Sequence, residues 1–491
     1  MQALACGTLT PRLAREVPAE AGRQNEMKRS EGSDRHTPRP SREGNQPSIR
    51  LYLALGIAAT VLLGCGSSVP SPLHASLYYV YTSTTSAMSL DANDHYCSLA
   101  EAIASVNAGI PRYDCQSQDP SAEAHTIEFR EGPGLPFSQH HFTVTSFTIN
   151  GTSAQIRIDG SGAFIDSTGI SAFDVRSGSS MSLQGVTLTY TGGASGGRLI
   201  ENYGTLSING ASLLDGDVTS QTSGLGGAIY NEGTITDLRD SLLQGNKAKL
   251  GGAIYNKDGA ITNLSAVISG NSATMAGGGI YNMNTIADPF GNATASITGR
   301  ATTITGNSAK AGGGIFNRGL FEMEATSITF NTAKGTGSGE TFASGQSCDG
   351  AGAGILGVSS STISADSRLR SGSALSDNTA SGLGGGVYNT GRMVLDGTEM
   401  ARNRAMSGAA IYTAFVSTSY CEVQYNADLD PSSIVGNQAT AGYSIVDGTG
   451  MVCLFEDDIL IPASGNSVPY CAPSSVAGDA EGPPPHGCPQ H

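Results

Sequence analysis

The sequence predicts an all-β protein that folds as a single-stranded, right-handed parallel β-helix with a short capping helix near its N-terminal end. Two repeated motifs indicate this fold, one rich in glycine and one that ends in asparagine. Composition is the third observation: among 491 residues there are 66 Gly and 13 Phe, no Trp, and only 14% charged residues. Such a chain lacks the charges of a coiled coil and the aromatics of one large globular core.

The glycine element recurs with the form GG[A/G][I/V][Y/F]N. Full copies stand at 226–231, 251–256, 277–282, 312–317 and 384–389, and degenerate copies at 196–202, 352–357 and 408–413. From the copy at 226 onward the spacings are 25, 26, 35, 40, 32 and 24 residues. The shortest spacings define one coil of about 24 residues with about three short strands, and the longer ones add a loop.

Each position of the glycine element has a predicted role. The Gly pair allows a positive φ at a tight corner. The Ile or Val points inward and stacks on its counterpart in the next coil, whereas the following Tyr or Phe points the other way.

The second element follows the pattern Leu/Ile-x-x-Asn. The asparagine of this element is Asn246, Asn271, Asn307, Asn331, Asn378, Asn403 and Asn437 in successive copies. Because Asn tolerates left-handed backbone geometry, we expect these residues at turns. Their side chains, stacked about 4.8 Å apart, would hydrogen-bond along the coils as a structural ladder. The alternative is that they are polar ligands in a groove.

The two elements resemble the repeats of the polymorphic outer-membrane proteins, whose signatures are GGAI and F-x-x-N. The GGAI sequence is present at 226–229 and 251–254, while Phe-x-x-Asn is mainly Leu/Ile-x-x-Asn in this chain. The resemblance implies a surface-exposed, adhesive β-helix. The repeats are expected to occupy 126–445.

Residues 96–107 (YCSLAEAIASVN) resemble the CSLREA motif. In that group a short amphipathic helix caps the first coil of a β-helix. Leu99, Ile103 and Val106 would share one helical face and cover the exposed sheet edge. We therefore expect an N-terminal cap at 77–125, and at 446–491 a cysteine-containing C-terminal cap with a disordered tail.

The N-terminal region has the pattern of a leader. A basic, polar stretch ends at Arg50, and an apolar run of 14 residues (51–64) leads to Cys65. This resembles the lipobox of bacterial lipoproteins, which implies a leader over 1–65, a linker over 66–76, lipidation (palmitate among the acyl chains) of Cys65 and attachment to the outer membrane through lipid. Residues 1–64 hold 9 Lys and Arg and 6 Asp and Glu, so removing them leaves 18 bases against 36 acids.

The remaining cysteines fit an oxidising compartment. Cys97 with Cys115 and Cys453 with Cys471 would each close a short loop, and Cys348 with Cys421 is a further option. Sequence does not determine the connectivity. No metal-like CxxC spacing is present, so we expect no zinc or other metal site.

The acidic balance argues against nucleic acid as a partner. Catalysis on a β-helix would need clustered carboxylates. The candidates are Asp159, Asp166, Asp174, Asp215, Asp217 and residues 456–458, together with the histidines at 140–141. They form no recognisable catalytic or cofactor motif. The expected function is a lipid-anchored, non-enzymatic surface protein that is structural, adhesive or glycan-binding; the alternative is a polysaccharide lyase or glycoside hydrolase.

Overall fold

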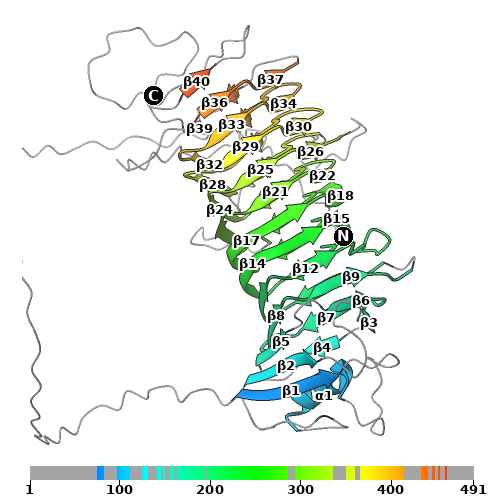
Figure 1. The fold of residues 1–491 in the computed structure, drawn as a ribbon. Coiled ribbons are helices and arrows are strands. Elements are labelled where there is room, and N and C mark those ends of the chain that lie inside the picture. The colour runs from blue at the N-terminus through cyan, green and yellow to red at the C-terminus, as the bar shows by residue number, and fades with distance from the viewer. Residues whose placement is uncertain are drawn as a thin grey trace, which may run out of the picture. The chain divides into compact units, whose positions relative to one another are not determined.

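The computed structural model describes residues 75–81, 97–110, 115, 124–130, 141–144, 147–149, 155–159, 163–193, 196–285, 294–335, 350–359, 365–413, 433–440, 445–447, 452–453 and 459–461. All of them belong to one compact unit. They form short strands that pair in parallel with the strand one coil further along, and the coils stack from α1 to β40 (Figure 1). The predicted all-β parallel β-helix with a short N-terminal helix is confirmed.

Each coil passes through up to four strand positions, which we call faces 1 to 4 in chain order. Faces 1 and 2 together form one 22-stranded sheet, face 3 a seven-stranded sheet and face 4 an 11-stranded sheet. Two long strands, β14 (Thr234–Gln244) and β17 (Ala260–Ser269), cross from face 1 to face 2 and join them. The sequence predicts about three short strands per coil, whereas the structure has up to four strand positions, which form three sheets because the largest sheet bends into two faces.

The other strands of face 1 are β1 (Ala75–Tyr81), β2 (Ala124–Arg130), β5 (Gln155–Asp159), β8 (Ser180–Gln184), β11 (Thr205–Asn209), β20 (Ser296–Arg300), β24 (Leu320–Glu324), β28 (Asp366–Arg370), β32 (Arg392–Leu395) and β39 (Val452–Cys453). Those of face 2 are β3 (His141–Val144), β6 (Phe164–Ser167), β9 (Thr187–Tyr190), β12 (Ser212–Leu214), β21 (Thr303–Thr305), β25 (Ser327–Thr329), β29 (Ala374–Ser376), β33 (Glu399–Ala401), β36 (Ser433–Val435) and β40 (Ile459–Ile461).

Face 3 consists of β15 (Lys247–Leu250), β18 (Ser272–Ala276), β22 (Ser308–Ala309), β26 (Thr332–Ala333), β30 (Thr379–Ala380), β34 (Arg404–Ala405) and β37 (Gln438–Ala439). Face 4 consists of β4 (Phe147–Ile149), β7 (Ser171–Val175), β10 (Arg198–Asn202), β13 (Ile229–Asn231), β16 (Ile254–Lys257), β19 (Ile280–Met283), β23 (Ile315–Arg318), β27 (Ile355–Gly357), β31 (Val387–Asn389), β35 (Ile411–Thr413) and β38 (Ile445–Asp447).

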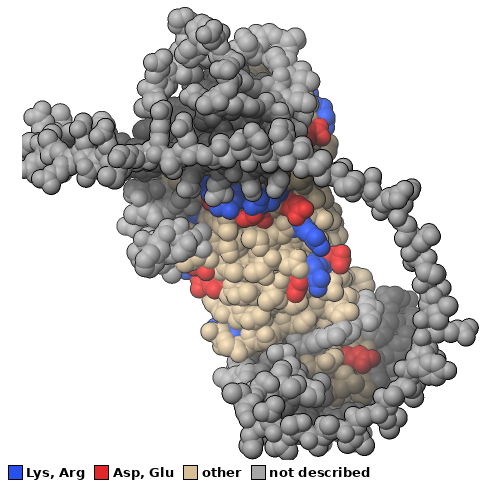
Figure 2. Space-filling model, turned by 90° about the vertical axis from the view of Figure 1, so that its left-hand side faces the viewer, with Lys and Arg blue, Asp and Glu red and all other residues tan. Residues whose placement is uncertain are grey.

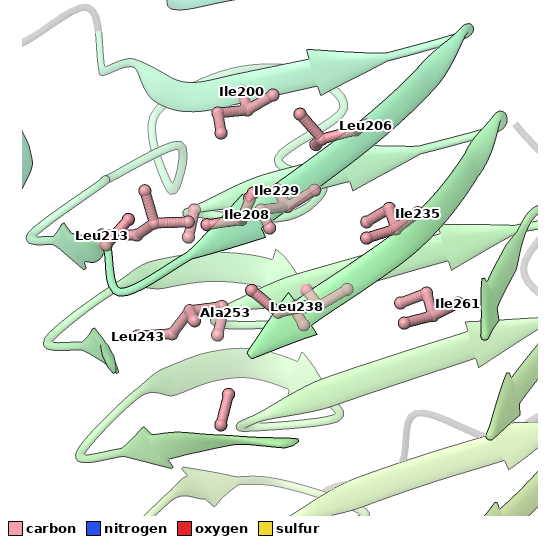
Figure 3. Close-up of a cluster of buried hydrophobic side chains, with 14 of the residues drawn as sticks. Ile200, Leu206, Ile208, Leu213, Ile229, Ile235, Leu238, Leu243, Ala253 and Ile261 are labelled. Carbon is pink, nitrogen blue, oxygen red and sulfur yellow. The ribbon is translucent and has the colours of Figure 1, made fainter. Parts of the chain in front are cut away.

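The core is a column of aliphatic side chains between the faces. The inward residue of each glycine element pairs in register with its counterpart, as Ile229 does with Ile254 and Ile254 with Ile280. Figure 3 shows such side chains from successive coils, with Ile200 and Ile229 of face 4 directed toward Leu206 and Ile235 of face 1. All four are fully buried. Side chains point alternately inward and outward along each strand, and strands of successive coils pair in the same register. Together these two features build the thin interior.

The predicted capping helix is α1 (Leu99–Ala108). The Ser98 hydroxyl accepts a hydrogen bond from the Glu101 amide at 3.2 Å, and the Glu101 carboxylate accepts one from the Ser98 amide at 2.9 Å. This capping box satisfies two amides at the helix start. Leu99, Ile103 and Val106 are buried and join the hydrophobic core, so this face of the helix covers apolar surface at the N-terminal end.

The β-structure extends beyond the range predicted for the repeats. β1 lies in the region expected to be linker and cap, yet it pairs in parallel with β2 along its whole length. At the other end, β39 and β40 lie beyond residue 445 and continue faces 1 and 2. Neither terminal strand contains a repeat motif, which is why the motifs did not reveal them.

Charged side chains are sparse and gather in small mixed groups on the surface drawn in Figure 2. The outer side of face 1 carries a mixed group of charges. There Arg368 pairs with Asp366 at 2.6 Å, and Arg370 pairs with Glu322 at 2.6 Å. Pairs this exposed stabilise the fold little.

Candidate functional site

The seven asparagines of the second element lie in one column at the corner between faces 2 and 3. From Asn246 to Asn437, each donates its side-chain amide to the side-chain oxygen of the next at 2.9–3.0 Å. Each amide also donates to a backbone carbonyl of the preceding coil. All seven are at most 2% exposed. Their polar groups are turned into the protein, and this placement matches a structural ladder better than a set of ligands.

The left-handed residue at this corner is the one before each asparagine. Gly245, Gly270 and Gly306 have φ of +71°, +62° and +64°, whereas none of the seven asparagines has a positive φ. The expectation that Asn itself takes the left-handed conformation is therefore wrong. The left-handed residue makes the turn, and the side chain of the asparagine that follows points inward, where the ladder forms.

A second asparagine ladder, which the sequence reasoning did not include among its site residues, lies at the end of the face 4 strands. Asn202, Asn231, Asn256, Asn282 and Asn317 are fully buried and donate in succession at 2.7–2.9 Å. The signal was present as the final Asn of the glycine element. Gly357 takes the next position and ends the run.

The predicted disulfide between Cys97 and Cys115 is present, with Cα atoms 4.6 Å apart. It links Cys97, two residues before α1, to Cys115. The backbone of Cys453 belongs to β39, while Cys471 and the lipidation candidate Cys65 lie outside the described residues.

The outer side of face 2 carries a patch of hydroxyl groups in the middle of the stack. Ser269, Thr303, Thr305, Ser327 and Thr329 form this patch, which we call the hydroxyl strip. Ser269 pairs in register with Thr305 and Thr305 with Thr329, while Thr303 pairs with Ser327. All five side chains are half-buried, and the Thr329 hydroxyl donates to that of Thr305 at 3.0 Å. The strands that carry the strip contribute no charged residue to it.

Two exposed apolar residues border the hydroxyl strip. Val267 precedes it on β17 and is 41% exposed; Phe330 follows Thr329 directly and is 62% exposed. Phe330 has φ of +55° and occupies the position held by Gly306 one coil earlier. A left-handed conformation costs a residue with a Cβ about 1–2 kcal/mol, so the chain keeps this phenylalanine against its backbone preference.

The outer side of face 4 carries a row of aromatic rings. Tyr230, Tyr255, Tyr281 and Phe316 stack with centroid distances of 5.6, 5.2 and 4.3 Å and are 3–8% exposed. Burial raises the pKa of Tyr255 to about 12. These rings pack against one another and against the Gly corners, so their faces are not available to a ligand.

In the degenerate copy 196–202, the outward position that holds an aromatic ring in the later coils holds an acidic side chain instead. Glu201 stands in register with Tyr230 on one side and with Asp174 of β7 on the other. Glu201 accepts a hydrogen bond from the Tyr203 hydroxyl at 2.6 Å and pairs with Arg198 at 3.4 Å, and Asp174 pairs with Arg176. Glu201 and Arg198 were missed by sequence reasoning, and their signal was the broken repeat GGRLIEN.

The two carboxylates differ in environment. Burial raises the pKa of Asp174, and the charge of Glu201 adds to the increase, while Arg176 opposes it. The Asp174 side chain is 9% exposed, and its Oδ1 has no hydrogen-bond partner among the residues described. A pair of carboxylates on neighbouring strands is the arrangement that glycoside hydrolysis uses.

The other candidate acids do not join this pair. Asp166 accepts a hydrogen bond from Thr189 on face 2, and Asp217 accepts from the Thr219 amide at 3.0 Å in a turn. Asp159 ends β5 on face 1, Asp215 takes a left-handed turn conformation, and residues 456–458 and His140 lie outside the described part of the chain. No group of His, Cys, Asp and Glu in the described ranges could hold a metal ion.

Asp174→Asn is expected to change how stability depends on pH. Because the pKa of Asp174 is raised on folding, the folded state keeps this proton to higher pH than the unfolded state. The contribution of Asp174 to the free energy of unfolding therefore falls as pH rises from the unfolded pKa, about 4, to the folded one. Denaturant titrations of both proteins between pH 4 and 8 measure the free energy of unfolding. Its value for the variant minus its value for wild type should rise through that window and then level off. A difference that stays flat or falls contradicts the raised pKa.

Within the described residues, no helix is long and apolar enough to cross a bilayer. No family model, curated protein or solved structure matches this chain.

Proposed function

We propose that this protein is a lipid-anchored surface protein of the bacterial cell envelope that binds an extended, uncharged glycan along face 2, without catalysis. The anchor is Cys65, attached to the outer membrane through lipid. The partner is a glycan in this proposal rather than a surface protein or a nucleic acid. The hydroxyl strip is the observation that carries it.

Three properties of the hydroxyl strip support a neutral, repeating ligand. Its hydroxyls can each donate and accept hydrogen bonds, as sugar hydroxyls do. Those of Ser269, Thr303 and Ser327 make no hydrogen bond to any described residue. The strip also repeats with the coil, so neighbouring hydroxyls recur about every 4.8 Å along the stack. An extended polymer can match such a repeat over several units.

A glycan array probed with the full chain tests this function. We expect neutral polysaccharides to be retained and the double variant Thr303→Val, Thr305→Val to lose at least tenfold in affinity. Val keeps the branched shape of Thr and removes the hydroxyl. The matched control is Thr205→Val with Thr234→Val, two in-register threonines of face 1. Equal binding by both double variants would refute the role of the strip.

The anchor has a separate test in membrane fractionation. Cys65→Ala should move the protein from the membrane fraction to the soluble fraction, because lipid is the only membrane contact in this proposal. An unchanged distribution would show that another segment holds the protein at the membrane.

A polysaccharide hydrolase is the second candidate, and the in-register pair Asp174 and Glu201 is the observation that favours it. Strand neighbours lie about 4.8 Å apart, close to the carboxyl separation in retaining glycosidases. The burial and arginine pairing of Asp174 weigh against an open catalytic site. Release of new reducing ends from a bound polysaccharide, abolished in Glu201→Gln, would favour the enzyme over the binding protein.

A further inference from the structure

We propose that Phe330 is a stacking platform for a pyranose ring of the glycan bound at the hydroxyl strip, which narrows the ligand to sugars with an apolar C–H face. This inference rests on the proposed function. It adds a specific contact, a sugar class and a reason for the strained backbone at this corner.

The corner between faces 2 and 3 takes the left-handed conformation in successive coils, and Asp377 and Arg402 hold it in the two coils that follow Phe330. Gly270 and Gly306 hold this left-handed position in the two preceding coils, and the Phe330 amide donates to the Ser376 carbonyl at 3.2 Å, continuing the same pattern. Glycine would satisfy this backbone without strain. The fold therefore does not require an aromatic residue at position 330.

The Phe330 ring contributes little to the packing of the protein. Phe330 is 62% exposed, and it is absent from the hydrophobic clusters formed by the buried residues. The aromatic rings of face 4, by contrast, are stacked and buried. A strained residue that is neither required by the turn nor packed in the core points to a contact outside the chain.

The neighbours of Phe330 indicate the chemistry of that contact. Thr329 and Thr305 present hydroxyls beside it, joined by a hydrogen bond of 3.0 Å. The face of an aromatic ring carries partial negative charge, so it attracts the weakly positive C–H groups of a pyranose. Hydroxyls for the polar edge of the sugar and a ring for its apolar face together fit a neutral hexose polymer.

On one side, the corner positions of the following coils hold charged residues. Asp377 holds the same corner position in the next coil and Arg402 in the coil after it, and the two pair with each other at 2.8 Å. Each charge is thus compensated by its neighbour, and the corner adds no net charge next to the ring. This balance favours a neutral sugar over a uronate or an amine.

Phe330→Gly and Phe330→Asn test the proposal, since both residues accept a positive φ and remove the ring. With a neutral polysaccharide identified on the array, such as a β-glucan, each variant should bind at least tenfold more weakly, about 1.4 kcal/mol. Phe330→Tyr should bind within about threefold of wild type. The unfolding midpoint of Phe330→Gly should equal or exceed that of wild type, so weaker binding cannot come from loss of fold.

The outcomes separate the two proposals. If Phe330→Gly and Phe330→Asn bind the polysaccharide as wild type does, while the Thr303→Val, Thr305→Val variant does not, the platform is refuted and the strip stands. If wild type binds no polysaccharide on the array, the proposed function fails, and the platform fails with it. A lowered midpoint in Phe330→Gly would show that the ring has a structural role instead.

Discussion

Asn271→Ala is expected to lower the free energy of unfolding by about 4 kcal/mol, because it removes one member of a buried ladder. Asn271 accepts from the backbone and side-chain amides of Asn246 at 2.9 and 3.0 Å. It also donates to Asn307 at 2.9 Å and to the Leu243 carbonyl at 3.0 Å. Alanine leaves several of these groups buried without a partner, and water cannot reach them. Denaturant unfolding followed by circular dichroism measures the loss.

The control for this variant is Asn263→Ala. Asn263 belongs to the same strand region but lies on its outer side, where its amide donates to Asp237 at 2.8 Å. Losing one partly exposed bond should cost about 1 kcal/mol or less. Similar losses in the two variants would show that the buried ladder is not a main source of stability.

Gly278→Ala should destabilise the protein by more than about 3 kcal/mol, although it adds only one methyl group. Gly278 is the second glycine of its pair. A Cβ there would overlap the carbonyl oxygen of Gly313 and lie 2.5 Å from that of Ser308, both backbone atoms of the next coil. Neither can move without separating the coils. Thermal and denaturant unfolding both report this loss.

Gly270→Ala provides the comparison for the glycine pair. Its φ is +62°, and nothing lies within 4 Å of an added Cβ. Gly270→Ala should therefore lower the free energy of unfolding only by the cost of placing alanine in a left-handed backbone, about 1 kcal/mol. If Gly278→Ala were no worse than Gly270→Ala, conformational freedom alone would explain the glycine pairs, and close contact between coils would not.

The sequence predicted the features that recur in every coil. Asn271 and Ile280 each belong to a motif whose copies share one environment, so repetition itself indicated which side chain stacks on which. The left-handed residue was assigned one position too late, because Asn is compatible with that conformation and the pattern alone does not separate neighbouring positions. The ladder side chains could still be identified, since their spacing does not depend on which residue turns the chain.

The candidate sites could not be predicted in this way, because they depend on register between coils and on breaks in the repeat. Ser269, Thr305 and Thr329 lie 36 and 24 residues apart, and an inserted loop conceals that all three share a row. Glu201 replaces the outward Tyr of the glycine element, and only the parallel pairing of β7 with β10 places it beside Asp174. Such local departures from the pattern are where function is expected.

Affinity electrophoresis of the full chain through gels that contain either a neutral glucan or a polyuronate tests binding at the hydroxyl strip most directly. We expect the neutral polymer to retard wild type equally at low and high salt, because no charge contributes to the contact. The Thr303→Val, Thr305→Val variant should run as it does in an empty gel. Retardation only by the polyuronate and only at low salt, or equal retardation of the variant and wild type by the glucan, would contradict a neutral glycan site on face 2.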